Sequence, residues 1–343
     1  MTDRVFIAAH GAIVLGSGVV CDGFDPYCSV RVQTHIHVDH MHGFASSKGV
    51  GEILATPATR DLLIEELNAD LKYRRNFRAI PYGVPEADGG IDGTITLQDA
   101  GHMAGSAQVL VVHDDGFRAA YSGDFSWPLE NVVEDPDVLV LDATYGSPDS
   151  VRKYSQQEAE DRFVEETLQR LKTGPVVIHA HRGTLQRAIS LLDDATPLPL
   201  LGSDLQRRES MVYERHGHLQ AVLTDPKSEE GKAAMEDGRY VLFIGKGDPR
   251  RDLGPNEHKI ILSAYMAPVG EPFLAYSEHS CRIAMSNHAD FNGTIEYVKA
   301  ARPREVLTDA SRSQHAPALA AAVSAQLGIP ARPAEPITNQ PWT

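Results

Sequence analysis

The sequence lacks the features that mark membrane and secreted proteins. No apolar run approaches the roughly 20 residues that a membrane-spanning helix needs. The first ten residues do not show the basic, apolar and small-residue regions of a signal peptide. Only three cysteines are present, too few and too scattered for a disulfide framework. These absences predict a cytoplasmic protein that does not enter a membrane.

The chain also lacks an excess of positive charge. It carries 32 Lys and Arg against 47 Asp and Glu, a formal net charge of −15. This balance argues against a protein coated with cations for nucleic acid. It does not exclude a nucleic-acid enzyme, because bound metal ions can set the local field.

One short segment departs from this acidic balance. Residues 72–78, KYRRNFR, combine four cations with two aromatic side chains. Such a segment can contact a phosphate backbone and stack bases. It can equally be a solvated helix end whose arginine stems lie along the surface, and the sequence alone favours this second interpretation.

The length of 343 residues and the changing texture of the chain predict two domains. The first 150 residues are rich in β-branched runs interrupted by glycine or proline, which predicts strands in stacked sheets. Residues 151–275 alternate strand-like and helix-like segments, which predicts a compact α/β domain with a parallel sheet. Its first helix is expected to begin at the capping box Ser155–Glu158. Residues 276–343 follow this domain as a separate segment.

The densest group of ionisable residues is the stretch QTHIHVDHMHGF, residues 33–44. His35 and His37 are two apart after an apolar run, so both can point to one side, and Asp39 and His40 follow on the turn. Imidazole nitrogen and carboxylate oxygen are good zinc ligands. The spacing disfavours a merely solvated histidine-rich loop. His42 breaks the pattern and is expected to lie outside the ligand set.

Two segments further along supply additional ligand types. His102 lies in a glycine-flanked turn before a strand, in DAGHMAGSAQ (99–108). Asp124 lies at the end of a strand, in YSGDFS (121–126). Each is a weak signal alone, but their order and their placement at strand ends after HIHVDH indicate one site.

This set of residues resembles the metallo-β-lactamase fold. The resemblance implies an αββα sandwich with two zinc ions at one edge of its sheets. It implies that His35, His37 and His102 hold one ion, that Asp39 and His40 hold the other, and that Asp124 bridges them. Asp22 matches an aspartate of that family that supports the metal loop. The same ligands also accept manganese or iron.

Two further motifs resemble the β-CASP subgroup of this fold. LDATYGSP (141–148) resembles its acidic motif, with Asp142 as the carboxylate, and SNHADFNGTIEYVKAARPREVLT (286–308) resembles its return motif, with His288 as the histidine. His279, in YSEHS (276–280), is a second candidate, and the spacing to Arg302-Pro303 favours His288. The resemblance makes 1–150 and 276–343 the metallo-β-lactamase domain and 151–275 the β-CASP insert.

β-CASP proteins are nucleases: Artemis-type and ligase-associated DNA nucleases, ribonuclease J and the pre-mRNA cleavage endonuclease. Their RNA-cleaving members carry a histidine after the last strand, where this chain has Asp309 or Ala310. Asp309 can replace it as a ligand of the second metal, or that site is weak. The missing histidine favours DNA as the nucleic-acid substrate over RNA.

The sequence therefore predicts a zinc-dependent nuclease, an exonuclease on single-stranded DNA ends in DNA repair or processing. Asp39 is expected to orient the attacking water, His288 to act as general acid and Asp142 to hold its imidazole. Arg182 and Lys246, in loops of the insert, are candidate phosphate contacts. The alternatives are an RNA-processing ribonuclease of the β-CASP type, a small-molecule ester or lactone hydrolase on the same fold, and a non-catalytic binding protein, which the intact ligand set disfavours.

Overall fold

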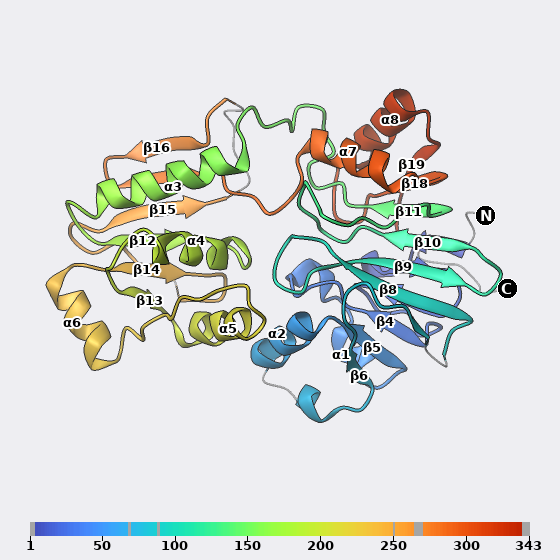
Figure 1. Ribbon diagram of the computed structural model, residues 1–343, viewed down its shortest axis with the longest axis horizontal. Helices are drawn as coiled ribbons and strands as arrows, with labels where there is room; N and C mark the ends of the chain where they lie inside the picture. The colour runs from blue at the N-terminus through green and yellow to red at the C-terminus, as the bar shows by residue number, and fades with distance from the viewer. Residues whose placement is uncertain (1–3, 68–69, 88–89, 250, 264–269, 338–343) are drawn as a thin grey trace. The chain divides into compact units, whose positions relative to one another are not determined.

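The computed structural model divides the chain into two units (Figure 1). Unit 1 comprises the chain up to Val151 together with the residues from His288 onward, and unit 2 comprises Arg152–Asn287. Unit 2 therefore begins next to the predicted boundary but ends twelve residues beyond residue 275, at 287. The residues that the structure describes are 4–67, 70–87, 90–249, 251–263 and 270–337.

Unit 1 contains two sheets. The first has the strand order β1-β2-β3-β4-β5-β6. Its strands are β1 (Val5–Ile7), β2 (Ile13–Leu15), β3 (Val19–Cys21), β4 (Val30–Val32), β5 (Glu52–Ala55) and β6 (Phe77–Ala79). The second has the order β19-β18-β11-β10-β9-β8-β7. Its strands are β7 (Glu86–Ala87), β8 (Gly93–Asp99), β9 (Ala107–His113), β10 (Arg118–Tyr121), β11 (Val138–Leu141), β18 (Glu305–Asp309) and β19 (Ala331–Ala334).

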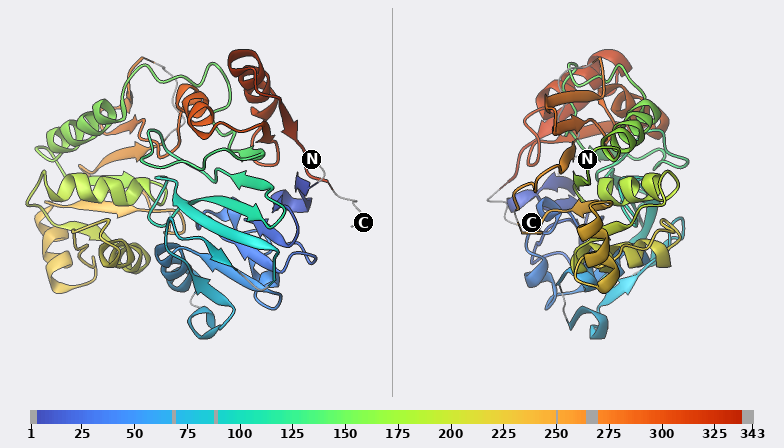
Figure 2. Two further views of the ribbon diagram at one scale, coloured as in Figure 1. Left: turned by 45° about the vertical axis from the view of Figure 1, so that its right-hand side comes forward. Right: turned by 90° about the vertical axis from the view of Figure 1, so that its left-hand side faces the viewer.

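Two hydrophobic cores hold these layers together. Alternating strand residues put apolar side chains of both sheets, such as Val30, Leu54 and Val109, into one buried cluster between them. The opposite face of the second sheet, including Leu139, packs with Tyr297 and the helices there. Figures 1 and 2 show these helices, α7 (Phe291–Ala301) and α8 (Ala316–Leu327), along that sheet. With α1 (Phe44–Ser47) and α2 (Pro57–Leu67) beside the first sheet, unit 1 is the predicted αββα sandwich.

Unit 2 is built on a mostly parallel sheet with the order β13-β14-β12-β15-β17-β16. Its strands are β12 (Val176–His179), β13 (Leu200–Gly202), β14 (Val241–Ile244), β15 (His258–Leu262), β16 (Phe273–Ser277) and β17 (Ser280–Ile283). β17 pairs parallel with β15, so the hairpin β16–β17 belongs to this sheet, which explains why unit 2 extends beyond residue 275. Its helices are α3 (Gln156–Arg170), α4 (Thr184–Asp193), α5 (Asp204–Arg215) and α6 (Glu229–Asp237).

The capping box at the start of α3 is present as predicted. Ser155 Oγ accepts a hydrogen bond from the Glu158 backbone N–H at 3.1 Å, and Glu158 Oε2 accepts one from the Ser155 N–H at 2.6 Å. These bonds satisfy backbone donors that a helix start leaves open. Among the described helices, none has both the length and the apolar character to cross a membrane.

Candidate metal centre

Strand direction brings the predicted ligands to one edge of unit 1. β10, β11 and β18 run parallel, so the segments that follow them leave the second sheet at the same edge. β9 is antiparallel to β10, so the turn before it lies at that edge too. The loop after β4 joins them, because Thr34 O accepts a hydrogen bond from Ala107 N–H at 3.1 Å. The separate motifs therefore converge through topology.

A glycine is required where the second sheet approaches this loop. Gly123 has φ +58°, and a Cβ there would lie 2.6 Å from the backbone oxygen of Ala107. Both the positive φ and the lack of space exclude a larger residue without backbone movement. Gly123 thus lets β10 turn so that Asp124 faces the histidines.

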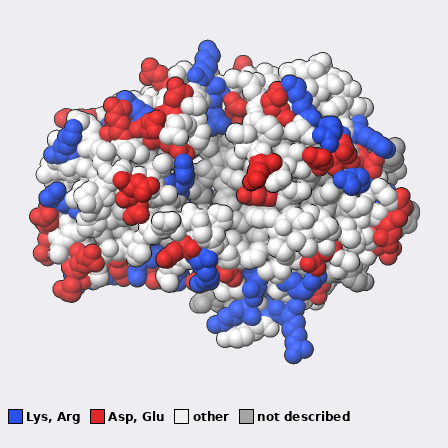
Figure 3. Space-filling view, in the orientation of Figure 1, with Lys and Arg blue, Asp and Glu red and all other residues white. Residues whose placement is uncertain are grey.

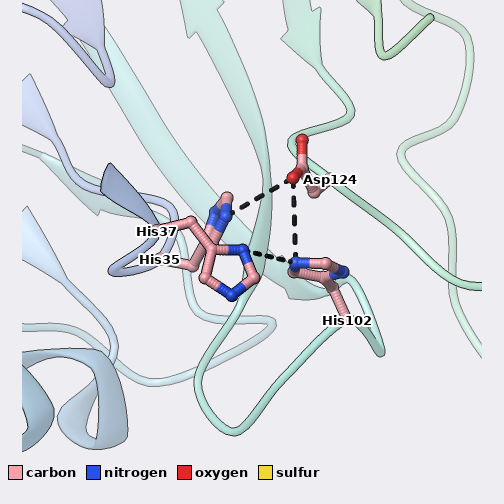
Figure 4. Close-up of side chains that lie close together, drawn as sticks. All are labelled: His35, His37, His102 and Asp124. Carbon is pink, nitrogen blue, oxygen red and sulfur yellow. Dashed lines mark hydrogen bonds and ion pairs between the residues drawn. The ribbon is translucent and has the colours of Figure 1, made fainter. Parts of the chain in front are cut away.

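Four predicted ligands lie together in Figure 4: His35, His37, His102 and Asp124. Their candidate ligand atoms lie within 4.8 Å of one another. His37 Nδ1 is 3.0 Å from His102 Nε2, and Asp124 Oδ2 is 3.5 Å from His35 Nε2 and 3.7 Å from His102 Nε2. Three imidazoles and one carboxylate therefore surround a common point.

His40 approaches Asp124 through the other carboxylate oxygen. His40 Nε2 lies 3.2 Å from Asp124 Oδ1 and 3.7 Å from Asp39 Oδ2. One oxygen of Asp124 thus faces His35 and His102, and the other faces His40, which is the arrangement that a bridging ligand needs. The Asp39 side chain is 65% exposed, whereas that of His40 is fully buried, so this second group is open on the Asp39 side.

Asp22 fixes the orientation of His40. Its Oδ2 lies 2.8 Å from His40 Nδ1 and accepts a hydrogen bond from Thr34 Oγ1 at 2.5 Å, and its Oδ1 accepts the Thr34 backbone N–H at 2.8 Å. Burial disfavours the charged carboxylate, but His40, together with His35 and Arg312, outweighs burial and lowers the pKa of Asp22. Because Nδ1 is occupied, Nε2 of His40 is the nitrogen left to face Asp124.

Asp142 and His288 lie next to this cluster. Asp142 follows β11, and its Oδ1 accepts hydrogen bonds from the Thr144 N–H and Oγ1, both at 2.8 Å. Its Oδ2 lies 3.3 Å from His288 Nδ1, and His288 Nε2 lies 3.8 Å from Asp124 Oδ2. Burial opposes protonation of His288, but the carboxylates of Asp124 and Asp142 outweigh burial and raise its pKa. The competing His279 lies in unit 2, in the turn between β16 and β17, beside His258.

Sequence comparison finds relatives that agree with this geometry. The family described as β-lactamase superfamily domain matches residues 29–197, which contain all six predicted metal ligands. A protein of Acidianus ambivalens described as an uncharacterized protein in lig 3′region is 38% identical over 114 residues, 33% of this chain and 79% of that protein.

The chain belongs to the β-lactamase superfamily. The metallo-β-lactamase fold predicted from the histidine and aspartate motifs is thereby confirmed, and this superfamily together with the candidate ligand cluster identifies a metal-dependent hydrolase.

Other relatives are consistent with the β-CASP subgroup. A probable DNA ligase of Opitutus terrae is 26% identical over 290 residues, 80% of this chain and 26% of that protein. An RNase J-like protein of Methanocaldococcus jannaschii is 26% identical over 166 residues, 43% of this chain and 38% of that protein. The chain therefore spans well under half the length of either relative.

A solved structure shares the fold of this superfamily member. The crystal structure of a protein of unknown function from Enterococcus faecalis superposes with a TM-score of 0.58 at 11% identity, covering 83% of this chain and 76% of that chain. At this identity the likeness concerns the fold alone.

The donor set of this β-lactamase superfamily member fits a divalent transition metal. The Nε2 atoms of His35, His37 and His40 are buried and form no hydrogen bond within the described part of the chain. Burying such atoms without a partner costs free energy, and a cation at the cluster would satisfy them. Burial, together with neighbouring imidazoles, lowers the pKa of His35 and His37, which favours the neutral form that binds metal.

Asp309 is engaged elsewhere. Its Oδ1 accepts hydrogen bonds from the Ser311 N–H at 2.8 Å and Oγ at 2.5 Å, and its Oδ2 accepts one from Arg312 at 2.8 Å. The guanidinium of Arg312 also donates to the backbone oxygens of Asp22 and Asp39, at 3.2 and 3.3 Å. The sequence analysis did not predict this role of Arg312. The available signal was its position, three residues after Asp309, the aspartate that ends a strand.

The remaining predicted residues lie outside the cluster. Arg182 precedes α4 and donates from Nε to the buried carboxylate of Glu209 at 2.6 Å. Lys246 is exposed in the turn after β14. Both belong to unit 2, and their contact with substrate stays a prediction. His42 stacks on His10 with ring centroids 4.2 Å apart, outside the candidate ligand groups of the described residues.

Proposed function

We propose that this chain is a zinc-dependent nuclease of the β-CASP type that hydrolyses phosphodiester bonds. The observation that carries the proposal is the adjacency of two groups within unit 1: a buried histidine–aspartate cluster and the Asp142–His288 pair. A metal-ligand cluster alone suits many hydrolases of this superfamily. A second carboxylate–imidazole pair beside it is what delivery of a proton to a leaving group requires.

The residues that would hold metal fall into two groups. His35, His37 and His102 would bind one ion, Asp39 and His40 a second, and Asp124 would contact both. Bound divalent cations would neutralise charge on a phosphate and lower the pKa of water, as they do in two-metal hydrolases. Zinc suits this donor set, and manganese or iron are accepted by the same ligands.

The chain's own residues supply positioning and proton transfer. The exposed carboxylate of Asp39 would orient the attacking water. His288 donates a proton from Nε2 to the leaving oxygen, because Nδ1 is held by Asp142. The carboxylate of Asp142 is itself fixed by Thr144, so the imidazole is held in one orientation.

The substrate we propose is the end of single-stranded DNA, in DNA repair or processing. Two observations support DNA. The relative named probable DNA ligase matches 80% of the chain. Asp309 stands in place of the histidine of RNA-cleaving members, and its carboxylate accepts a hydrogen bond from Arg312. The relative named RNase J-like supports the alternative of RNA processing. The α/β insert disfavours a small-molecule ester or lactone hydrolase. Three buried, unpaired cysteines suit a cytoplasmic enzyme.

One assay tests the class of reaction. Purified protein of measured metal content is given 5′-labelled single-stranded DNA, 5′-labelled RNA, and a chromogenic ester and lactone. We expect the wild type to degrade nucleic acid, and DNA faster than RNA. His37→Ala should abolish this activity. His42→Ala should keep it, since His42 lies in the same loop but outside the cluster. Turnover of the ester or lactone without nucleic-acid cleavage would contradict the proposal.

A further inference from the structure

A group of cations gathers on one surface of unit 1, although the chain carries a net charge of −15. We call Lys48, Lys72, Tyr73, Arg74 and Arg75 the basic patch. It combines the end of α1 with the turn η4 (Asp70–Tyr73) and the residues before β6. Figure 3 shows Lys and Arg side chains protruding together at the lower edge of this face, below α2 and β6 of Figure 1.

The basic patch stands on a fixed framework. Leu71 and Phe77, which flank it, are 0% and 4% exposed. The guanidinium of Arg74 donates to Lys48 O at 2.7 Å, and Asn76 Nδ2 donates to Gly51 O at 2.8 Å. These bonds hold the two parts of the patch together, although they are more than twenty residues apart in sequence. The cations are therefore displayed by a folded segment rather than by a loose end.

Three cations of the basic patch have no carboxylate partner in the described part of the chain. Lys72 and Arg75 are exposed and Lys48 is partly exposed. By contrast Arg78, just beyond the patch, pairs with Glu52 at 3.1 Å. Unneutralised cations at this density favour a polyanion as the partner.

Tyr73 adds an aromatic surface to the basic patch. Its side chain is 76% exposed, the highest exposure, with Val222, among the large hydrophobic side chains that the structure describes. The ammonium of Lys72 lies 4.8 Å from the centroid of its ring. An exposed ring beside cations is the combination with which proteins hold an unpaired base and its phosphate. An anionic membrane would instead need exposed apolar residues for insertion. Leu71 and Phe77, on either side of residues 72–76, are buried, and Val50, two residues after Lys48, is 42% exposed.

We propose that the basic patch binds single-stranded nucleic acid, with Lys48, Lys72 and Arg75 contacting phosphates and Tyr73 stacking on a base. The identity of the polyanion rests on the proposed function. The patch is a binding surface additional to the metal cluster and takes no part in the chemistry.

The charge of the patch is tested by the double variant Lys72→Glu/Arg75→Glu. Its matched control is Lys227→Glu/Arg239→Glu, an exposed lysine and arginine of unit 2 with the same charge change. Fluorescence anisotropy with labelled oligothymidylate, in EDTA so that nothing is cleaved, gives the affinity at several salt concentrations. We expect the patch variant to bind at least tenfold more weakly, with a salt slope smaller by about 1.4, since each phosphate contact contributes about 0.7 for a single strand.

The outcomes separate this inference from the proposed function. Equal affinity and slope in the patch variant and wild type, or equal loss in both double variants, overturns the patch as a nucleic-acid surface. Binding of the wild type to phosphatidylserine vesicles in preference to the oligonucleotide overturns it too. The wild type can also fail to cleave nucleic acid while the patch variant, but not the control double variant, binds oligothymidylate more weakly than the wild type. In that case the proposed function fails and the binding surface stands.

The stacking role of Tyr73 is tested separately. Tyr73→Leu is expected to weaken binding of the single strand at least about fivefold, and to leave a duplex of equal length unaffected, because paired bases offer no free face. Tyr73→Phe should restore the affinity. Tyr276→Leu is the control, since Tyr276 is a half-exposed tyrosine of unit 2 that also lies beside an arginine. If Tyr73→Leu lowers the affinity equally for single strand and duplex, or does not lower it for the single strand, the stacking role is overturned.

Discussion

The two halves of the candidate metal centre differ in burial and in support. His35 and His102 are buried, and His37 is partly buried with its Nε2 atom buried. The three come from two loops joined by a backbone hydrogen bond. On the other half, His40 is buried but Asp39 is largely exposed, and this half is held through Asp22 and Arg312. Rigid, buried donors favour tight binding, because little order is lost when the cation binds. The comparison predicts one tight site and one weaker site.

The largest effect should come from the buried half. His37→Ala removes one of the three imidazoles of the cluster His35, His37, His102 and Asp124, so we expect loss of both ions and of activity. Metal content by elemental analysis and nuclease activity are measured together, with His42→Ala as control. If His37→Ala kept the full metal content, the three histidines would not form the tight site.

The pair beside the cluster should separate chemistry from metal binding. His288→Ala is expected to lower the rate about 10²–10⁴-fold, the usual contribution of a general acid, with metal content unchanged. His279→Ala, the variant of the competing histidine, should leave the rate near that of the wild type. Loss of metal in His288→Ala would make His288 a ligand and would remove the distinction between the two groups.

The open half can be weakened through its support. Asp22→Asn replaces the carboxylate that holds His40, and we expect the affinity for the second ion to fall about 10–100-fold while the first is unchanged. Stepwise cobalt titration, followed by absorbance, measures the two affinities. Asp25→Asn is the control, because this neighbouring aspartate accepts a backbone hydrogen bond from Tyr27 and does not contact the cluster. An equal fall in both affinities would mean that the two halves are not independent.

The smallest effect should come from Arg312→Lys. Lysine keeps the buried charge beside Asp309 but cannot reach the backbone oxygens of Asp22 and Asp39 with a planar fork. We expect a loss of second-ion affinity smaller than that of Asp22→Asn, with the first site intact. The same cobalt titration measures it. A gain in second-ion affinity would show that Arg312 opposes the second cation rather than positioning its ligands.

Parts of this picture were readable in the sequence because they depend on short spacings. The spacing of His35, His37, Asp39 and His40 after a strand predicted a ligand loop, and the structure brings His102 and Asp124 to it. The alternation of helix and strand predicted the α/β character of the insert, but the return to unit 1 occurs twelve residues later than expected. Pairing of β17 with β15 decides that boundary, and such a pairing leaves no local signal.

The sequence by itself determined the types of ligand, because these follow from donor chemistry within a few residues, and the resemblance of its motifs to the metallo-β-lactamase fold implied the superfamily and the αββα layers. Only the tertiary structure decided which partner each buried group takes. In the folded chain Arg312 donates a hydrogen bond to the Asp309 carboxylate, Asp22 contacts the His40 imidazole, and His288 lies beside Asp142, 146 residues away in the chain. A buried polar group must bond to whatever the fold brings within reach, and that choice depends on strand pairing across the whole unit.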